Sequence, residues 1–204
     1  MDTERCWEII EAARVKAGTE WNELDERLEE ALIDQLVRLP LADIVAFEVR
    51  FDDLQARVHR DDLWMAAFLI HNGCGDDSFT DFGAGVVGLG RDWCERALAD
   101  PDNLAEHPAV RGVAAGTVHN SVLLTEGFQF APQQAYERLT DGDDCAYYQA
   151  LDAAEQAMRS DIPPDSPPLL PRRLERLAAM FPEQHDFLDR FYPGLTGAPN
   201  RRIR

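Results

Sequence analysis

Residues 63–70 read Leu-Trp-Met-Ala-Ala-Phe-Leu-Ile, and the fold class depends on how these eight apolar residues are interpreted. A run of this length fits a buried strand as well as a buried helix, because either can bury all of its side chains. The Met-Ala-Ala centre and the helical periodicity on both sides favour a helix in the middle of a bundle. Asn72-Gly73, which follows, is typical of a helix C-terminal cap.

Apolar residues recur at helical spacing along most of the remaining chain. Before the central run, helices are expected over residues 6–17, 21–39 and 44–58, with a break at Pro40. After it, they are expected over 79–89, 91–100, 110–130, 131–139 and 144–158. No alternating strand pattern is present. The sequence therefore predicts an all-α fold, an irregular multi-helix bundle with one buried central helix.

The chain is expected to divide near residue 160. Residues 1–160 form the predicted helical core domain, and 161–204 a Pro-rich connector with a C-terminal helical arm that packs back on the core. Prolines at 163, 164, 167 and 168 are typical of a stiff, extended connector. Leu170, Leu174, Leu177 and Phe181 then predict an amphipathic helical segment, with further apolar residues after it.

Composition excludes several classes of function. With 20 basic and 38 acidic residues, the 204-residue chain has a formal net charge of -18, which disfavours a nucleic-acid partner. No apolar run is long enough to span a membrane, and the N-terminus lacks the apolar core of a signal peptide. The four cysteines form no CxxC pair, which is typical of free thiols in the cytoplasm.

The best candidate for a functional site is the loop at residues 71–78, because it combines an imidazole, a thiol and two adjacent carboxylates. Its predicted catalytic residues are Cys74, Asp76 and Asp77. The side chains predicted to bind a ligand are His71, Trp64, Phe68, Phe79, Phe82 and Arg91. The alternative is purely structural, with an aspartate capping the next helix and Cys74 filling a small space.

Three metal or cofactor patterns fail on inspection. His71-x-x-Cys74-x-Asp76 lacks the further ligands that zinc requires. Residues 83–88 match G-x-G-x-x-G without a preceding strand, so their glycines predict close approach of a helix or ligand rather than a dinucleotide site. The acidic residues at 141–152 lack the glycine of a calcium loop. No metal and no cofactor are expected.

The central segment reads Asp62-Leu63-Trp64-x-Ala66-Ala67-Phe68-Leu69-Ile70-x-x-Gly73-Cys74-x-Asp76-Asp77-x-Phe79-x-x-Phe82. It resembles W-D-L-W-x-A-A-Y-x-I-x-G-G-C-S-D-D-x-F-x-Y-F-R, the signature of a bacterial domain family of unknown function (DUF4240 type) that is frequent in actinobacteria. That family continues with G-R, A-L and P-D-x-L, matched here by Gly90-Arg91, Ala97-Leu98, Pro101-Asp102 and Leu104.

The resemblance implies no established activity or ligand. Where the family has an aromatic-Phe-Arg step, this chain has Asp81-Phe82-Gly83. The arginine that would neutralise the paired aspartates is therefore absent, which indicates a diverged member.

Two functional hypotheses follow. The first is a cytosolic helical protein with a small-molecule pocket at this loop, in which one carboxylate acts as a general base if the protein is an enzyme. The second is a non-enzymatic interaction or accessory module with a protein partner. Since two buried carboxylates need a cation, the first hypothesis predicts an arginine, expected to be Arg91, within hydrogen-bonding distance of Asp76 or Asp77.

Overall fold

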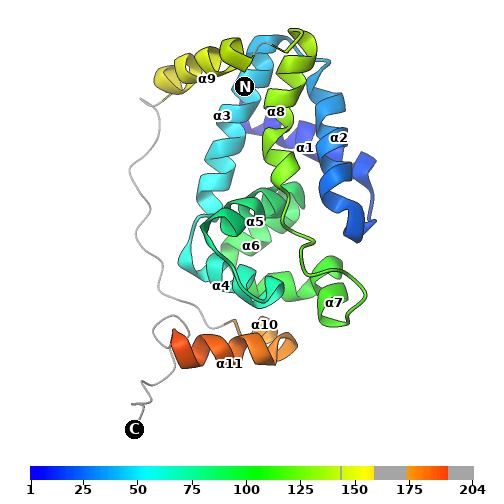
Figure 1. Cartoon of the computed structure of the whole chain (residues 1–204), viewed down its shortest axis with the longest axis vertical. Helices are drawn as coiled ribbons and strands as arrows, with labels where there is room; N and C mark the ends of the chain where they lie inside the picture. Colours follow the sequence, from blue (N-terminus) through cyan, green and yellow to red (C-terminus); the bar gives the residue numbers. More distant parts are fainter. Residues whose placement is uncertain (143, 159–173, 193–204) are drawn as a thin grey trace.

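A computed structural model of the chain describes residues 1–142, 144–158 and 174–192 (Figure 1). Its helical elements, in chain order, are α1 (Thr3–Ala17), η1 (Trp21–Glu23), α2 (Leu24–Leu36), α3 (Leu41–Val58), α4 (Asp61–His71), α5 (Asp76–Gly88), α6 (Arg91–Ala99), η2 (Pro101–Glu106), α7 (Pro108–Ala114), α8 (Glu126–Leu139), α9 (Asp144–Met158), α10 (Glu175–Met180) and α11 (Pro182–Phe191).

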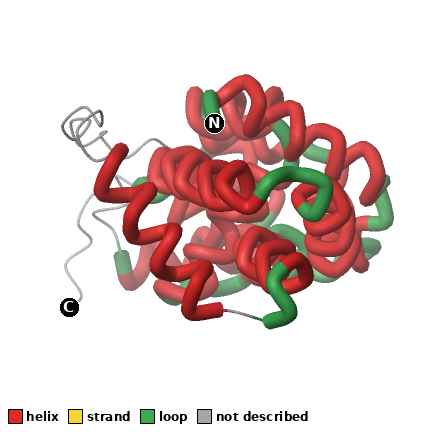
Figure 2. The backbone as a smooth tube through the Cα atoms, turned by 90° about the horizontal axis from the view of Figure 1, so that it is seen from above, coloured by secondary structure: helices red, strands yellow, loops and turns green. Residues whose placement is uncertain are grey.

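The predicted all-α fold is confirmed, and the described residues contain no strand (Figure 2). Several helix boundaries fall where the sequence signals placed them. Pro40 precedes α3, and Asn72 ends α4 in the left-handed conformation with φ 61°. Asn tolerates this conformation better than most residues, which explains why the apolar run stops there.

The centre of the bundle is formed by two helices rather than by residues 63–70 alone. Every residue from Phe82 in α5 to Gly90, just after this helix, is buried, so this segment is enclosed on all sides. Helix α4 buries most of its apolar residues but leaves Trp64 and Phe68 partly exposed on one face. Around them, α2 packs against α1 and α8, and α3 packs against α5, α8 and α9.

The helix expected over residues 110–130 is wrong. Helix α7 ends at Ala114, Gly116 has a φ of 69°, and the chain runs through turns to Glu126. Helix α8 then continues through Pro132, a residue expected near the start of a separate helix. Val122 and Leu123 are buried by tertiary contacts although they lie outside a helix. Apolar residues were therefore needed here for burial, and the prediction wrongly read them as one face of a helix.

The C-terminal segment lies at the end of the molecule opposite α9 (Figure 1). Helix α10 packs against α4 and η2, and α11 packs against α4. We call residues 174–192, which contain both helices, the arm. Leu174, Leu177, Phe181 and Leu188 of the arm are buried. The predicted Pro-rich connector and Leu170 lie outside the described residues, and the division near residue 160 stays a prediction.

A buried carboxyl group lies where α9 packs on α3. The Glu48 carboxyl faces the buried Tyr147 hydroxyl, with Asp52 and Glu155 nearby. Burial, reinforced by the charge of Asp52, raises the pKa of Glu48 from 4.5 to about 8. Because this pKa is higher in the folded state, the contribution of Glu48 to stability is complete below pH 4.5 and is lost as the pH rises through 8.

Glu48→Gln is therefore expected to flatten the decline of stability between pH 5 and pH 8. At pH 8 the variant should be more stable than the wild type by about 1–3 kcal/mol, since Gln carries no charge into the interface. Urea unfolding across this pH range measures the effect. Glu30→Gln, at an exposed position on α2, is the control and should leave the pH profile unchanged. Parallel profiles for Glu48→Gln and wild type would contradict the assignment.

The glycines of α5 allow another segment to approach its backbone, as their pattern predicted. A Cβ atom at Gly85 would lie 2.1 Å from the Leu123 carbonyl oxygen, which belongs to backbone that cannot move independently. At Gly83 the nearest atom would be Cγ of Gln55, at 3.3 Å, on a flexible side chain. The close approach is thus a backbone contact at Gly85.

Gly85→Ala is expected to destabilise the fold by at least about 1–3 kcal/mol, because the added methyl group forces the two backbones apart. Gly83→Ala is the matched control, and its stability should stay within about 1 kcal/mol of wild type, since the helix propensity of Ala offsets a small shift of Gln55. Equal losses in the two variants, measured by urea unfolding, would show that the Leu123 contact does not constrain α5.

Candidate functional site

The candidate loop connects α4 to α5 through four residues. Gly73 has a φ of 129°, a conformation that favours glycine, and Gly75 is the N-cap of α5. Asp76 and Asp77 occupy the first turn of α5, and both are exposed to solvent. No side-chain hydrogen bond caps the helix, so neither aspartate has the predicted capping role. Their carboxylates instead lie near the positive end of the helix dipole.

The predicted arginine partner of these aspartates is wrong. The Arg91 guanidinium lies 2.7 Å from the Glu4 carboxylate, and its backbone N–H donates to Glu11. It thus belongs to an open, acidic hollow between α1 and α6. Arg60, the other candidate, binds the buried Asp62 carboxylate with two nitrogens, at 3.0 and 2.5 Å. Sequence proximity failed because both arginines lie on helix ends that face other carboxylates.

His71 and Cys74 are also poorly suited to catalysis. The Nδ1 atom of His71 hydrogen-bonds to the Asn120 carbonyl oxygen and therefore carries the proton. Burial lowers the pKa of His71 to about 4, so the ring is neutral near pH 7 and cannot neutralise the aspartates. Burial, with Asp76 and Asp81, raises the pKa of Cys74 to about 11. The thiolate needed for nucleophilic attack is therefore scarce.

The four aromatic residues predicted to line one pocket divide into two groups. Phe79 and Phe82 are buried and stacked at 6.2 Å, and His71 packs edge-on against Phe82 at 5.6 Å. Trp64 and Phe68 pack together at 5.5 Å on the opposite side of the loop region, facing the arm. Among the described rings, no contact joins the two groups. Phe79 and Phe82 are part of the hydrophobic core, whereas Trp64 and Phe68 lie near the surface.

Trp64 and Phe68 continue into a series of rings on α11. Phe68 stacks on Phe187 at 5.6 Å, and Trp64 packs against Tyr192 at 6.2 Å. Phe191 adds a further ring, 4.6 Å from Phe187. We call these five residues the aromatic surface. The three on the arm remain 46–55% exposed, so the contact with α4 leaves much of each ring facing solvent.

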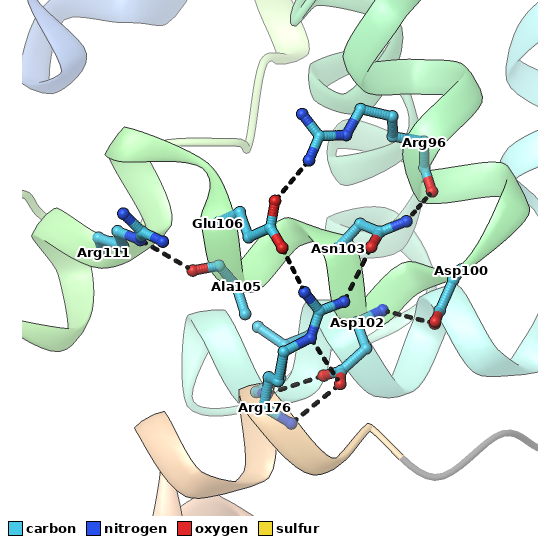
Figure 3. A network of polar contacts seen from close by, with 9 residues as sticks. Arg96, Asp100, Asp102, Asn103, Ala105, Glu106, Arg111 and Arg176 are labelled. Atoms are coloured by element: carbon cyan, nitrogen blue, oxygen red, sulfur yellow. Dashed lines mark hydrogen bonds and ion pairs between the residues drawn. The ribbon is translucent and has the colours of Figure 1, made fainter.

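The arm is held by a polar network that the site prediction missed. The Asp102 carboxylate of η2 accepts hydrogen bonds from the backbone N–H groups of Arg176 and Leu177, at 2.9 and 2.8 Å (Figure 3). The Arg176 guanidinium donates to Asp102, Asn103 and Glu106. Figure 3 shows these η2 side chains converging on Arg176. We call Asp102, Asn103 and Glu106 the socket.

Among the described residues, no cluster of three or more His, Cys, Asp or Glu side chains is arranged to hold a metal ion. Nor does any described helix combine the length and apolarity needed to cross a membrane. The four cysteines, all within the described residues, form no disulfide bond.

A comparison with known families matches residues 1–138 to the family described as "Protein of unknown function (DUF4240)". The chain belongs to this family. The match contains α4, the loop, α5 and the socket, and it ends before the arm. No curated protein and no solved structure matches the chain.

Family membership supports the resemblance seen in the sequence without adding an activity. The socket lies within that resemblance, because Pro101-Asp102 was one of its matched pairs. The signal that could have revealed the socket was Arg176, which stands beside the apolar Leu177. The helical segment predicted there rested only on its apolar residues.

Asp77→Ala is expected to lower stability by only about 0.3–1 kcal/mol, the range for a charge near a helix N-terminus. Asp2→Ala provides the comparison, because the Asp2 carboxylate caps α1 by accepting the Arg5 N–H at 2.8 Å. Loss of that cap should cost about 0.5–2 kcal/mol. Both are measured by thermal unfolding, and a larger loss in Asp77→Ala would give the loop a structural role beyond the helix dipole.

Proposed function

We propose that this DUF4240 protein is a non-enzymatic interaction module that binds a partner protein in the cytoplasm through its aromatic surface. The observation that carries the proposal is the continuous series of rings from α4 to the arm, two partly buried on α4 and three about half exposed on the arm. Exposed aromatic side chains are typical of interaction sites, because they bury much apolar area with few rotamers to fix. Four cysteines without a disulfide bond agree with a cytoplasmic location.

The charge around these rings favours a basic partner. Glu183 and Asp186 are exposed on α11, beside or one turn from Phe187, and Arg190, which lies over the Phe191 ring at 5.3 Å, is the exposed basic residue of this helix. The whole chain carries a net charge of -18. A partner segment with arginine and apolar side chains would satisfy the ring faces and the acidic rim together.

The candidate loop supports this proposal over catalysis. Asp76 and Asp77 are exposed, Cys74 has a raised pKa, and His71 is buried and neutral. These groups do not combine into a nucleophile with an adjacent base.

A small-molecule site at the loop is the second candidate function. It is favoured by one observation, that the buried Nε2 atom of His71 has no hydrogen-bond partner. Since Nδ1 carries the proton, Nε2 is an acceptor that a ligand N–H or O–H would satisfy. A thermal shift caused by a metabolite and abolished in His71→Phe would favour this second candidate.

The double variant Phe187→Ser/Phe191→Ser is expected to abolish capture of a basic partner from a lysate of the source organism, because it removes two exposed rings. Phe130→Ser is the matched control, since Phe130 on α8 is 49% exposed and outside the aromatic surface. Quantitative mass spectrometry of cross-linked complexes measures capture. Loss of the same partner in the control, or absence of any stoichiometric partner with wild type, would contradict the proposal.

A further inference from the structure

The socket and the arm belong to separable parts of the chain. Asp102 lies in the part matched by the family, whereas Arg176 and Leu177 lie 36 or more residues beyond its end at residue 138. Yet every hydrogen bond that the Asp102 carboxylate accepts from a distant element comes from the arm. Asp102 is 6% exposed with the arm in place, so departure of the arm would remove these donors and open the carboxylate to another donor segment.

The contact recognises conformation as well as charge. Arg176 and Leu177 lie in the first turn of α10, and the free N–H groups of a helix start are well placed to reach one carboxylate. The Arg176 guanidinium meanwhile uses three nitrogens on three different side chains, at 3.2, 2.8 and 2.6 Å. Leu174 and Leu177 bury their side chains beside these contacts. A Leu-x-Arg-Leu segment that begins a helix therefore supplies donors to all three socket side chains and two leucines to the apolar contact beside them.

We propose that the surface of η2 and α4 on which the arm packs, here called the arm-binding surface, also docks a Leu-x-Arg-Leu helical segment of a partner protein, and that the arm is its intramolecular competitor. The proposal goes beyond the proposed function, because it concerns the surface under the arm: the aromatic surface needs the arm docked on α4, whereas this second site opens only when the arm leaves. Displacement of the arm frees Trp64 and Phe68, the two rings that α11 covers, for the incoming segment.

The arm has the properties of a displaceable element. It packs on α4 and η2 through one face, whereas Phe187 and Phe191 of α11, and Tyr192 after it, face solvent. A segment at the surface that packs through one face opens at a lower free energy than the enclosed core does. Asp102 and Glu106 of the socket, with Asp100 beside them, would also attract another arginine-bearing segment when the arm leaves.

The test uses a fluorescent peptide of residues 174–192 and the full-length chain. Leu177→Asp should undock the chain's own arm, because it places a charge at a fully buried position. The peptide should then bind this variant at least about tenfold more tightly than wild type, in which the arm competes. Adding Asp102→Asn to Leu177→Asp should weaken binding by about tenfold or more, since hydrogen bonds to a charged acceptor are lost.

Hydrogen exchange of the α10 and α11 amides reports whether the arm has undocked. Arg176→Ala is a second release variant that leaves the buried leucine in place, and a peptide carrying the same change is the control ligand. The proposal is overturned if the amides stay protected in both release variants, if the released chains fail to bind the peptide, or if Asp102→Asn leaves binding unchanged.

This result is separable from the test of the aromatic surface. Partner capture that depends on Phe187 and Phe191, together with a failed peptide experiment, would support the aromatic surface as an interaction site. It would reject the displacement of the arm by a partner segment. Peptide binding without any ring-dependent partner would show the opposite.

Discussion

The approach of the Leu123 carbonyl to the backbone at Gly85 is the contact on which the arrangement of α4 and α5 depends. The segment between α7 and α8 lies directly on α5 there, because no side chain intervenes. The same segment carries Asn120, whose carbonyl accepts from His71 and whose side-chain amide donates to the His71 carbonyl oxygen at 2.8 Å. One irregular segment thus ties the end of α4 to the middle of α5. The loop between them is fixed by this core contact, which leaves its aspartates at the surface.

Buried titratable groups change the stability of this core with pH in two opposite directions. Burial lowers the pKa of His71 and His107 from 6.5 to about 4, so their contribution to stability is lost as the pH falls through that range. Nδ1 of His107 accepts the Ala109 N–H at the start of α7, and protonation there would remove the acceptor. Asp25 acts in the opposite direction, because burial and the Glu29 charge raise its pKa to about 6. Both sets contribute fully only when they are uncharged.

Local sequence signals predicted most of the helices, but they did not predict which side chains of different helices contact each other. Pro40 and Asn72 mark boundaries because their backbone preferences act within the chain's immediate neighbourhood. Trp64 and Phe68 share a face at helical spacing, but which element covers that face is decided by an arm more than 100 residues later. Arg91 likewise pairs with Glu4, which is 87 residues away. The predicted Arg91 partner of the loop aspartates was wrong because it assumed that neighbours in sequence converge in space.

The excess of acidic residues explains why the arm needs directional contacts rather than attraction alone. A surface with a net charge of -18 draws any basic segment toward it, but such attraction does not orient what it draws. At the socket, the planar Arg176 guanidinium must match three acceptors while the neighbouring backbone N–H groups meet the same carboxylate. A lysine offers a single ammonium group and lacks the rigid fork that this arrangement uses. The net charge attracts every basic segment equally. The positions of the acceptors on η2 favour a segment that has an arginine at the start of a helix.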